Sequence, residues 1–156
     1  MSWTTDTNLL SVSPLTAVDI DRFLQRRGSP LTCIGCPVIS AQAKYGINAT
    51  YILAHAIHET GWGTSAICRE KHNLYGWMAF DDSPMASATT FADPAECIDY
   101  VMGRIRALYL TEGGMYYHGA TLAGMNVNYA TDKNWGGKIA RICFLIEDQC
   151  CPQPAH

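Results

Sequence analysis

The segment Thr50–Glu59 is the part of the sequence that most limits what this chain can fold into. Its residues are apolar at almost every position, with His55, His58 and Glu59 as the exceptions. A helix that is apolar on most of its faces belongs in the middle of a domain, because none of those faces can be left in water. Asn48 precedes the segment as a typical helix cap, and a Gly-Trp-Gly run interrupts it soon after Glu59. The sequence therefore predicts a buried central helix with an acid near its carboxyl end.

Amphipathic helices are predicted on both sides of this segment. Thr16 with Asp19 has the pattern of a capping box, and Asp93 followed by Pro, Ala and Glu is a second strong helix start. Another helix is expected over about residues 36–45, and the last one begins after Asp132. The positions expected to face the core are Ile20, Phe23, Leu24, Val38, Ala41, Cys97, Val101, Ile105, Leu108, Ile139, Ile142, Cys143 and Ile146.

The other segments are not helical in pattern. Between residues 71 and 91, aromatic residues, Gly, Asp and Pro replace the helical periodicity, which predicts a loop or a small β-hairpin. We expect residues 1–15 to run as an extended arm and residues 151–156 to form a tail. The sequence thus predicts one mostly α (α+β) domain over residues 16–150.

Length and charge argue against several classes of protein. The 156 residues suffice for one domain with a real core, and 16% charged residues are typical of a folded globular chain. The net charge is −3 and the basic residues form no run, which argues against a nucleic-acid binder. No apolar run approaches the roughly 18 residues of a membrane span, and the first residues lack the features of a signal peptide. We expect a monomer that is not inserted in a membrane.

The seven cysteines leave three alternatives open. An odd number argues against a closed set of disulfides, although some disulfides remain one alternative. The pair in Cys33–Cys36 could join Cys150–Cys151 as four ligands of a structural zinc ion. Plain thiols are the third alternative. Cys97 and Cys143 fall on apolar stripes, where a thiol acts as a small hydrophobic side chain.

Glu59 requires a chemical explanation because a carboxylate on an apolar helix is costly. Burial, the negative end of the helix dipole and the indole of Trp62 are all expected to raise the pKa of Glu59. A carboxyl group that stays protonated near neutral pH can act as a general acid toward a glycosidic oxygen, as it does in lysozyme. The alternative is a structural contact between Glu59 and His55, one turn earlier.

Other catalytic patterns are not supported. His55, His58 and Glu59 do not follow the His-Glu-x-x-His order of zinc proteases or its inversion, and no third ligand is evident. Ser65 lacks the Gly-x-Ser-x-Gly surroundings of a nucleophilic serine. We therefore expect neither a catalytic metal ion nor a cofactor.

Three motifs occur in a fixed order along the chain. They are HETGWGTS at residues 58–65, NLYG at residues 73–76, and YATD at residues 129–132, with Lys138-Ile139 beyond. In this order and spacing they resemble glycoside hydrolase family 73, the β-N-acetylglucosaminidases of bacterial autolysins, flagellar wall hydrolases and phage lysins. The resemblance covers about residues 16–147.

This resemblance implies a lysozyme-like helical fold with a substrate groove and a small β-hairpin or flexible lobe beside it. It implies that Glu59 is the general acid and that Tyr129 lies in the groove near the reacting sugar. The second carboxylate of such enzymes lies after the Asn-Leu-Tyr-Gly motif, where this sequence offers Asp81 and Asp82. Either could activate water, or both could be turn formers while the N-acetyl group of the substrate assists.

Several other side chains are candidates for contact with sugar, because aromatic rings pack well on flat sugar faces. Trp135 is expected to pack in the core instead, since it lies on the apolar stripe of the last helix. Asp132 also suits the cap of that helix. The candidates for the groove are Trp62, Asn73, Tyr75, Trp77 and Asp132.

The expected function is hydrolysis of the β-1,4 bond between N-acetylglucosamine and N-acetylmuramic acid in peptidoglycan, with Glu59 as the acid. One alternative is a lytic transglycosylase, which forms anhydro-muramyl ends, and another is a non-catalytic wall-binding module of the same fold. With no signal peptide in view, we expect a bacteriolytic endolysin of a phage or prophage. Such a protein would leave the host cytoplasm by a separate route and act on the bacterial cell wall.

Overall fold

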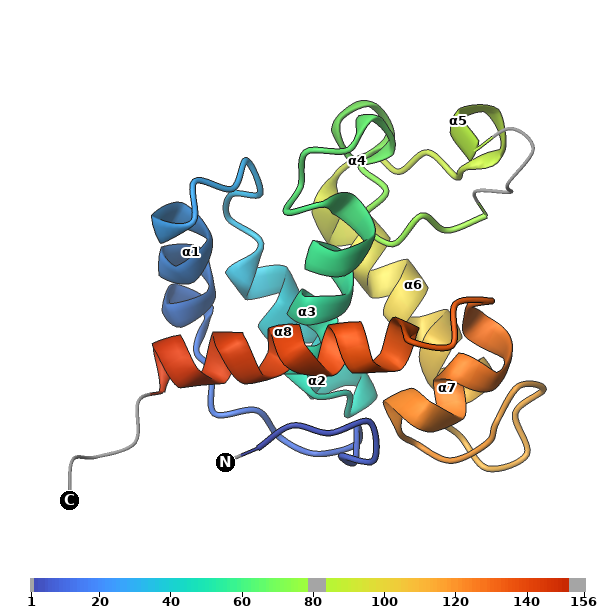
Figure 1. Ribbon diagram of the computed structural model, residues 1–156. Coiled ribbons are helices and arrows are strands. Elements are labelled where there is room, and N and C mark those ends of the chain that lie inside the picture. Colours follow the sequence, from blue (N-terminus) through green and yellow to red (C-terminus); the bar gives the residue numbers. More distant parts are fainter. Residues whose placement is uncertain (1, 79–83, 152–156) are drawn as a thin grey trace, which may run out of the picture.

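The structure is a computed structural model that describes residues 2–78 and 84–151. Within these two ranges the chain forms eight helices and no strand. Figure 1 shows how these helices are arranged. The mostly helical class predicted from the sequence is confirmed. The helices are α1 (Ala17–Arg26), α2 (Gly35–Tyr45), α3 (Ala49–Thr60), α4 (Ala66–Lys71), α5 (Pro84–Ser87), α6 (Pro94–Tyr109), α7 (Leu122–Tyr129) and α8 (Trp135–Cys150).

Helix α3 is the predicted central helix. The side chain of Asn48 accepts hydrogen bonds from the backbone of the first turn, and Gly61 ends the helix in the left-handed conformation that glycine adopts easily. Every residue from Ala49 to Ile57 is buried. Helix α3 packs chiefly against α8 and also against α2, so apolar neighbours surround it. Its carboxyl end, which carries Glu59, is therefore held rigidly.

The helices around α3 begin where the sequence predicts. Thr16 and Asp19 form a complete capping box for α1, and the side chain of Asp93 caps α6. The short helices α4 and α7 were not predicted, although Ser65 and Thr121 cap them in the usual way. Helices of 6 and 8 residues offer too few turns for a clear apolar stripe.

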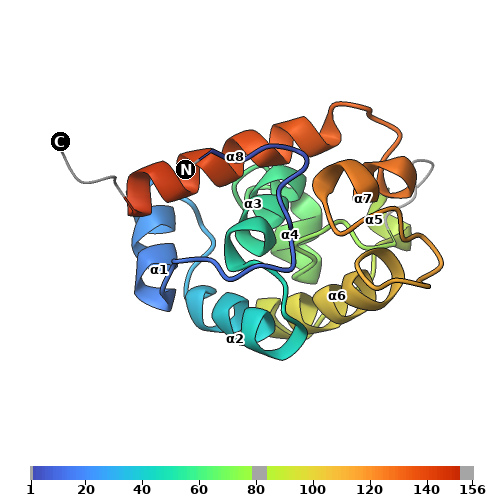
Figure 2. The same ribbon diagram turned by 90° about the horizontal axis from the view of Figure 1, so that it is seen from below.

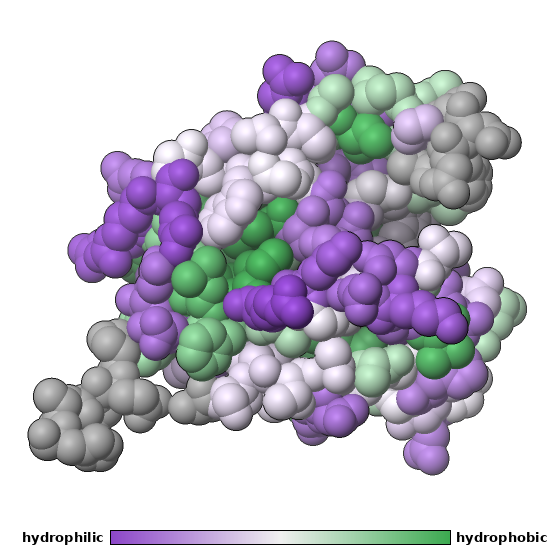
Figure 3. All heavy atoms as spheres, viewed as in Figure 1, coloured by the Kyte–Doolittle hydropathy of each residue, from purple (hydrophilic) through white to green (hydrophobic). Residues whose placement is uncertain are grey.

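The outward side of α8 is largely hydrophilic over its N-terminal half, and its inner side packs on α3 (Figure 3). None of the described helices combines the length and apolar character needed to cross a membrane. The residues before α1 form no helix and run across the molecule, as seen from below in Figure 2. Leu9 is fully buried, and its backbone bonds Ala120 and Asn48. This segment thus ties the start of α3 to the α6–α7 connection.

Two backbone hydrogen bonds hold together the start and the end of the segment between α4 and α6. Phe91 N–H donates to the Lys71 carbonyl at 2.9 Å, and Thr89 N–H donates to the Trp77 carbonyl at 3.0 Å. The buried amide of Asn73 donates to the carbonyls of Trp77 and Thr89, which fixes the two arms together. This network holds the Trp77 backbone beside the end of α3.

The segment between α4 and α6 was expected to be a loop or a small β-hairpin. Its described residues form loops and the short helix α5. A β-ladder needs a run of extended residues on each arm. On the first arm His72, Gly76 and Met78 all have positive φ, which interrupts such a run. The predicted β-hairpin is therefore absent from residues 71–78 and 84–91, and these described residues make a looped lobe.

Candidate active site

A cavity of about 800 Å³ opens beside the carboxyl end of α3. Its walls come from α3, the loop after α4, one side of α6, the end of α7 and the start of α8. Segments far apart in the sequence thus meet around one hollow. The lining residues are His58, Glu59, Tyr75, Gly76, Trp77, Met78, Arg104, Leu108, Tyr109, Tyr116, Tyr129, Ala130, Thr131, Asp132 and Trp135.

Glu59 reaches the cavity from the last turn of α3, and its side chain keeps 25% of its surface exposed. Its Oε1 accepts a hydrogen bond of 2.9 Å from the indole nitrogen of Trp135. The Nε2 of His55 lies 3.5 Å from the same oxygen. The other oxygen, Oε2, lies 4.0 Å from the point where a Cβ would stand on Gly76, a cavity residue. One oxygen is thus held by the protein, while the other is available to a ligand.

The pKa of Glu59 differs in direction from the sequence prediction. Burial raises it, as expected, but the side-chain contact with His55, the Trp135 hydrogen bond and the nearby His58 together lower it below the usual carboxyl value. The prediction of a raised pKa is therefore wrong. Burial and the helix end were recognised from the sequence, but His55 was considered there only as a structural contact and the Trp135 donor arrives from a distant helix.

Aromatic rings form the wall next to Glu59. Tyr129 stacks on Trp135 with ring centroids 5.0 Å apart, and Tyr109 meets the edge of Tyr129 at 5.2 Å. Burial raises the pKa of the Tyr129 phenol well above its usual value, so its hydroxyl keeps its proton. Tyr75 also lines the cavity and donates its hydroxyl proton to the Ile52 carbonyl. The cavity therefore offers flat apolar surface beside one carboxylate.

Four of the predicted site residues line the cavity with Glu59: Tyr75, Trp77, Tyr129 and Asp132. Asp132 forms an ion pair of 2.7 Å with Lys138, and its other oxygen accepts the backbone N–H of Asn134. It thus braces the turn before α8, whose N-cap residue is Asn134. The predicted cap of the last helix by Asp132 is therefore wrong by two residues.

Two other predicted residues lie outside the cavity lining. Trp62 was expected to cover Glu59, but it packs against Phe23 at 5.8 Å and under the guanidinium of Arg27. Its backbone has a φ of 62°, which turns the chain away after Gly61. Asn73 is buried and braces the loop through its amide. Asp81 and Asp82, the candidates for the second carboxylate, lie outside the described residues.

Sequence reasoning missed two features of the site. Trp135 packs in the core as predicted, with 3% of its surface exposed, yet its indole N–H also binds Glu59. Arg104, on α6, is exposed at the cavity wall and has no ion pair or hydrogen bond with the described residues. Neither residue belongs to a recognisable motif. The local signal for Arg104 is its spacing of four residues from Leu108, which places this cation on the same face of the helix.

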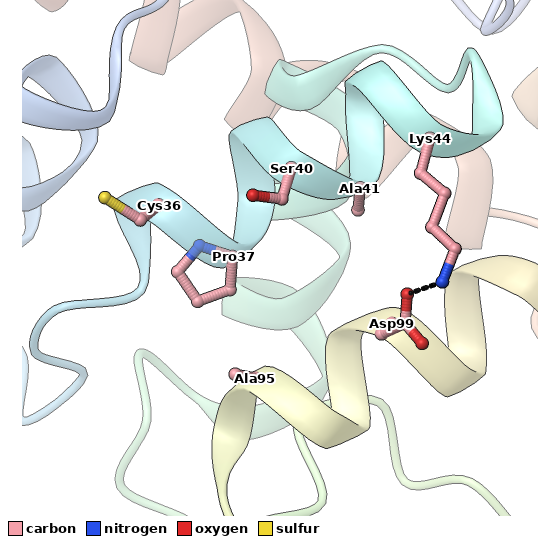
Figure 4. Close-up of a pocket in the computed structure, with 7 residues that line it drawn as sticks. All are labelled: Cys36, Pro37, Ser40, Ala41, Lys44, Ala95 and Asp99. Carbon is pink, nitrogen blue, oxygen red and sulfur yellow. Dashed lines mark hydrogen bonds and ion pairs between the residues drawn. The ribbon is translucent and has the colours of Figure 1, made fainter.

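A second, smaller hollow of about 350 Å³ lies between α2 and α6 (Figure 4). Its two charged groups, Lys44 and Asp99, pair with each other at 2.9 Å and are both largely exposed. This surface ion pair leaves no free charge in the hollow for a ligand. The residues drawn there are Cys36, Pro37, Ser40, Ala41, Lys44, Ala95 and Asp99.

The cysteines are free thiols throughout the structure. Cys97 and Cys143 are fully buried on the core sides of their helices, as predicted. Cys33–Cys36 lies at the start of α2 and Cys150–Cys151 at the end of α8. Across residues 2–78 and 84–151, no three His, Cys, Asp or Glu side chains gather as ligands for a metal ion. The structure therefore does not assemble the four-cysteine zinc site that the sequence left open.

Comparison with known sequences identifies relatives. Residues 37–146 match the sequence profile of the glucosaminidase family, described as mannosyl-glycoprotein endo-beta-N-acetylglucosaminidase. A Streptococcus pneumoniae serotype 4 protein assigned as an endo-beta-N-acetylglucosaminidase is 34% identical over 145 residues, which cover 91% of this chain and 22% of that protein. The chain thus spans about a fifth of the length of this curated relative.

Two crystal structures of Staphylococcus aureus Autolysin E share the fold. One is a catalytic mutant in complex with the disaccharide NAG-NAM, with a TM-score of 0.77 and 22% identity over 96% of this chain and 74% of the other. The second contains the muropeptide NAM-L-Ala-D-iGlu, with a TM-score of 0.76, 24% identity and the same coverage. The helical, lysozyme-like architecture expected from the sequence is confirmed by this likeness.

Proposed function

The chain belongs to the glucosaminidase family, and on that premise we propose that it hydrolyses the β-1,4 bond between N-acetylglucosamine and N-acetylmuramic acid in peptidoglycan. Family membership confirms the resemblance to glycoside hydrolase family 73. The observation that carries the proposal is the state of Glu59. One carboxylate oxygen is held by a protein donor and the other is free beside an aromatic wall in a cavity of about 800 Å³.

Glu59 supplies the proton in this reaction. A sugar strand that fills the cavity displaces water from Oε2, and this added desolvation raises the pKa of Glu59 above its value in the empty site. The protonated Oε2 then donates to the glycosidic oxygen while the bond from that oxygen to C1 breaks. Negative charge returns to Glu59, where the Trp135 indole stabilises it through Oε1. A water molecule adds to C1 and loses one proton, which completes the hydrolysis.

We propose that Asp81 or Asp82 takes the proton of this water. Alternatively, the N-acetyl oxygen of the substrate bonds C1 as the leaving oxygen departs, and a water molecule then displaces it and gives a proton to the Glu59 carboxylate. Asp81 and Asp82 follow the loop residues Trp77 and Met78, which line the cavity. Tyr129, whose hydroxyl keeps its proton, is proposed as a hydrogen-bond donor to the reacting sugar, and Tyr75 and Trp77 as contacts along its face.

The chemistry of the cavity suits peptidoglycan in a second respect. Arg104 at the cavity wall has no ion-pair or hydrogen-bond partner among the described residues, whereas the charge of Asp132 is balanced by Lys138. Peptidoglycan carries carboxylates on its muramyl groups and stem peptides, and a guanidinium binds carboxylates well. Neutral polymers of N-acetylglucosamine lack such groups. We therefore propose an acidic glycan strand as the substrate.

A turbidity assay on purified cell walls tests the proposal, with Glu59→Gln compared to the wild type. Loss of lysis by the correctly folded Glu59→Gln variant is expected, because an amide cannot donate the required proton. Glu112→Gln is the matched control, since Glu112 is exposed and lies outside the cavity lining. Full lysis by Glu59→Gln would overturn the mechanism, and no lysis by the wild type would favour a wall-binding module.

Mass spectrometry of the released glycans separates hydrolysis from transglycosylation. A reducing N-acetylglucosamine end that incorporates one oxygen from labelled water is expected. An anhydro-muramyl end without that oxygen would show a lytic transglycosylase instead. The assignment to a phage or prophage endolysin, rather than to a bacterial autolysin, stays a prediction.

A further inference from the structure

Three side chains at intervals of four residues form a chain of contacts along α3. The hydroxyl of Tyr51 lies 2.9 Å from Nδ1 of His55, and Nε2 of His55 lies 3.5 Å from Oε1 of Glu59. Tyr51 and His55 are both fully buried, whereas Glu59 reaches the cavity. A spacing of four places the three side chains on one stripe of the helix. His55, which is itself in contact with Tyr51, therefore contacts Glu59 from the buried interior of the protein.

The direction of the hydrogen bonds follows from the surroundings of Tyr51. Burial raises the pKa of its phenol well above the usual value, so the hydroxyl keeps its proton. Among the described residues, the partner within reach of this hydroxyl is Nδ1 of His55. A buried hydroxyl proton needs an acceptor, so Tyr51 donates and Nδ1 accepts. The imidazole then carries its own proton on Nε2, which faces Glu59.

The His55 ring has little freedom to turn. Tyr75 and Tyr129 meet it with centroids 5.0 Å away, and Trp135 meets it at 5.3 Å, all three edge to face. The Nε2 atom is buried and has no hydrogen-bond partner among the described residues, and Oε1 of Glu59 lies 3.5 Å from it. A ring held in this way keeps its N–H directed at Oε1 of Glu59.

We infer that Tyr51 and His55 are positioning residues, which hold Oε1 of Glu59 as an acceptor and leave Oε2 as the oxygen that carries the catalytic proton. This inference rests on the proposed function of Glu59. Trp135 donates a hydrogen bond to Oε1 and the Nε2 of His55 lies 3.5 Å from the same oxygen, so both stabilise the carboxylate that remains after proton transfer. They also disfavour a proton on Oε1, because each presents a hydrogen to that oxygen. The proton of the acid is thereby confined to the oxygen nearest Gly76 in the cavity.

The test compares His55→Phe, Tyr51→Phe and the double variant by their kinetics on peptidoglycan fragments across pH. His55→Phe keeps a ring among the aromatic neighbours but removes the donor. We expect kcat to fall about threefold to tenfold, because a polar contact of 3.5 Å to a charged group is weaker than a short hydrogen bond, with little change in KM. The alkaline midpoint of kcat/KM should rise by about one pH unit, because the carboxylate loses a stabilising donor.

The other variants test whether Tyr51 acts on Glu59 through His55. Tyr51→Phe should shift the midpoint the same way by a smaller amount, and it should add nothing in the His55→Phe background. Tyr45→Phe is the matched control, because it removes a hydroxyl that bonds Asp99 far from the cavity. The other charged groups around Glu59 are His58 on α3, Arg104 on α6, and Asp132 and Lys138 near the start of α8. All four stay unchanged in these variants.

Two results would overturn this inference and leave the proposed function of Glu59 standing. One is an inactive Glu59→Gln variant together with a His55→Phe variant that keeps the wild-type pH midpoint and loses only thermal stability. The other comes from the intact protein and does not depend on folding of a variant. Nitrogen-15 NMR of the His55 imidazole should show a proton on Nε2, and a proton on Nδ1 would exclude a hydrogen bond donated by Tyr51 to that nitrogen.

Discussion

The indole nitrogen of Trp135 donates a hydrogen bond of 2.9 Å to Oε1 of Glu59, although the two residues lie 76 positions apart. The contact joins the first turn of α8 to the last turn of α3, two helices that pack closely along the core. Trp135 is nearly fully buried and stacks on Tyr129. The packing of the core and the orientation of the candidate acid thus depend on the same side chain.

Trp135→Phe separates these two contributions. The phenyl ring keeps most of the stacking on Tyr129 but offers no N–H to Glu59. We expect kcat/KM on cell-wall fragments to fall about tenfold to a hundredfold, since one hydrogen bond to a charged group is lost. Unfolding free energy should fall by about 1 to 3 kcal/mol. Trp3→Phe is the control, because Trp3 is a buried indole outside the cavity lining, and unequal activity losses in the two variants are expected.

The pH dependence should differ between the free and the occupied protein. Burial acts to raise the pKa of Glu59. In the free protein, however, the contact with His55 and the hydrogen bond from Trp135 hold this pKa below the usual carboxyl value. A general acid loses activity as pH rises through its pKa. A bound strand excludes water from Oε2 and raises that pKa.

The alkaline limb of kcat should therefore lie at higher pH than the alkaline limb of kcat/KM. The first reports the complex and the second the free protein. Rates measured from about pH 3 to pH 9 on soluble glycan fragments would determine both limbs, since this span brackets ordinary carboxyl pKa values. Coincident limbs, or limbs in the reverse order, would contradict the proposed effect of water exclusion.

Much of the fold follows from local signals in the sequence. The caps at Thr16, Asn48 and Asp93 mark the starts of α1, α3 and α6, because each satisfies backbone donors within three residues. The central position of α3 follows from its lack of a polar face. Helices α4 and α7 were missed because a short helix buries few residues, although each has a capping side chain.

The site was less predictable than the fold because it is built from contacts that are distant in the sequence. Glu59 and Tyr129 were found through motifs. The contact of Trp135 with Glu59 depends on how α8 crosses α3, and no periodicity reports that crossing. Trp62 follows Glu59 by three positions but leaves the helix with a positive φ, so helical spacing did not apply to it. The direction of the Glu59 pKa shift was wrong because His55, four residues earlier, was considered only as a structural contact, and because the Trp135 donor comes from a distant helix.

Gly76→Ala tests whether Oε2 is the reactive oxygen. The added methyl carbon would stand 4.0 Å from Oε2, where the glycosidic oxygen has to approach. We expect kcat/KM to fall by about tenfold or more, because a small displacement of reacting groups is costly. The alanine would also have to adopt a positive φ, which costs about 1 kcal/mol of stability. Gly28→Ala is the matched control, with a φ of 66° against 61° and open space around it. Equal activity of both variants would place the reaction away from Oε2.

Arg104 gives the sharpest test of the substrate class, because its effect should depend on the charge of the strand. Arg104→Gln removes the free cation of the cavity wall without altering a contact to the described residues. We expect kcat/KM on peptidoglycan fragments to fall about threefold to tenfold, a modest loss because water screens an exposed guanidinium. The loss should shrink in high salt, since ions screen surface charges.

Cleavage of neutral N-acetylglucosamine oligomers, where it can be measured, should be unchanged by Arg104→Gln because these oligomers carry no carboxylate. Arg104→Lys should keep part of the preference, since it retains the charge but not the planar fork of donors. Arg141→Gln removes an exposed cation from α8, outside the cavity lining, and serves as the control. An equal loss on acidic and neutral strands would mean that Arg104 supports the cavity wall. The preference for an acidic strand would then have to come from another part of the cavity.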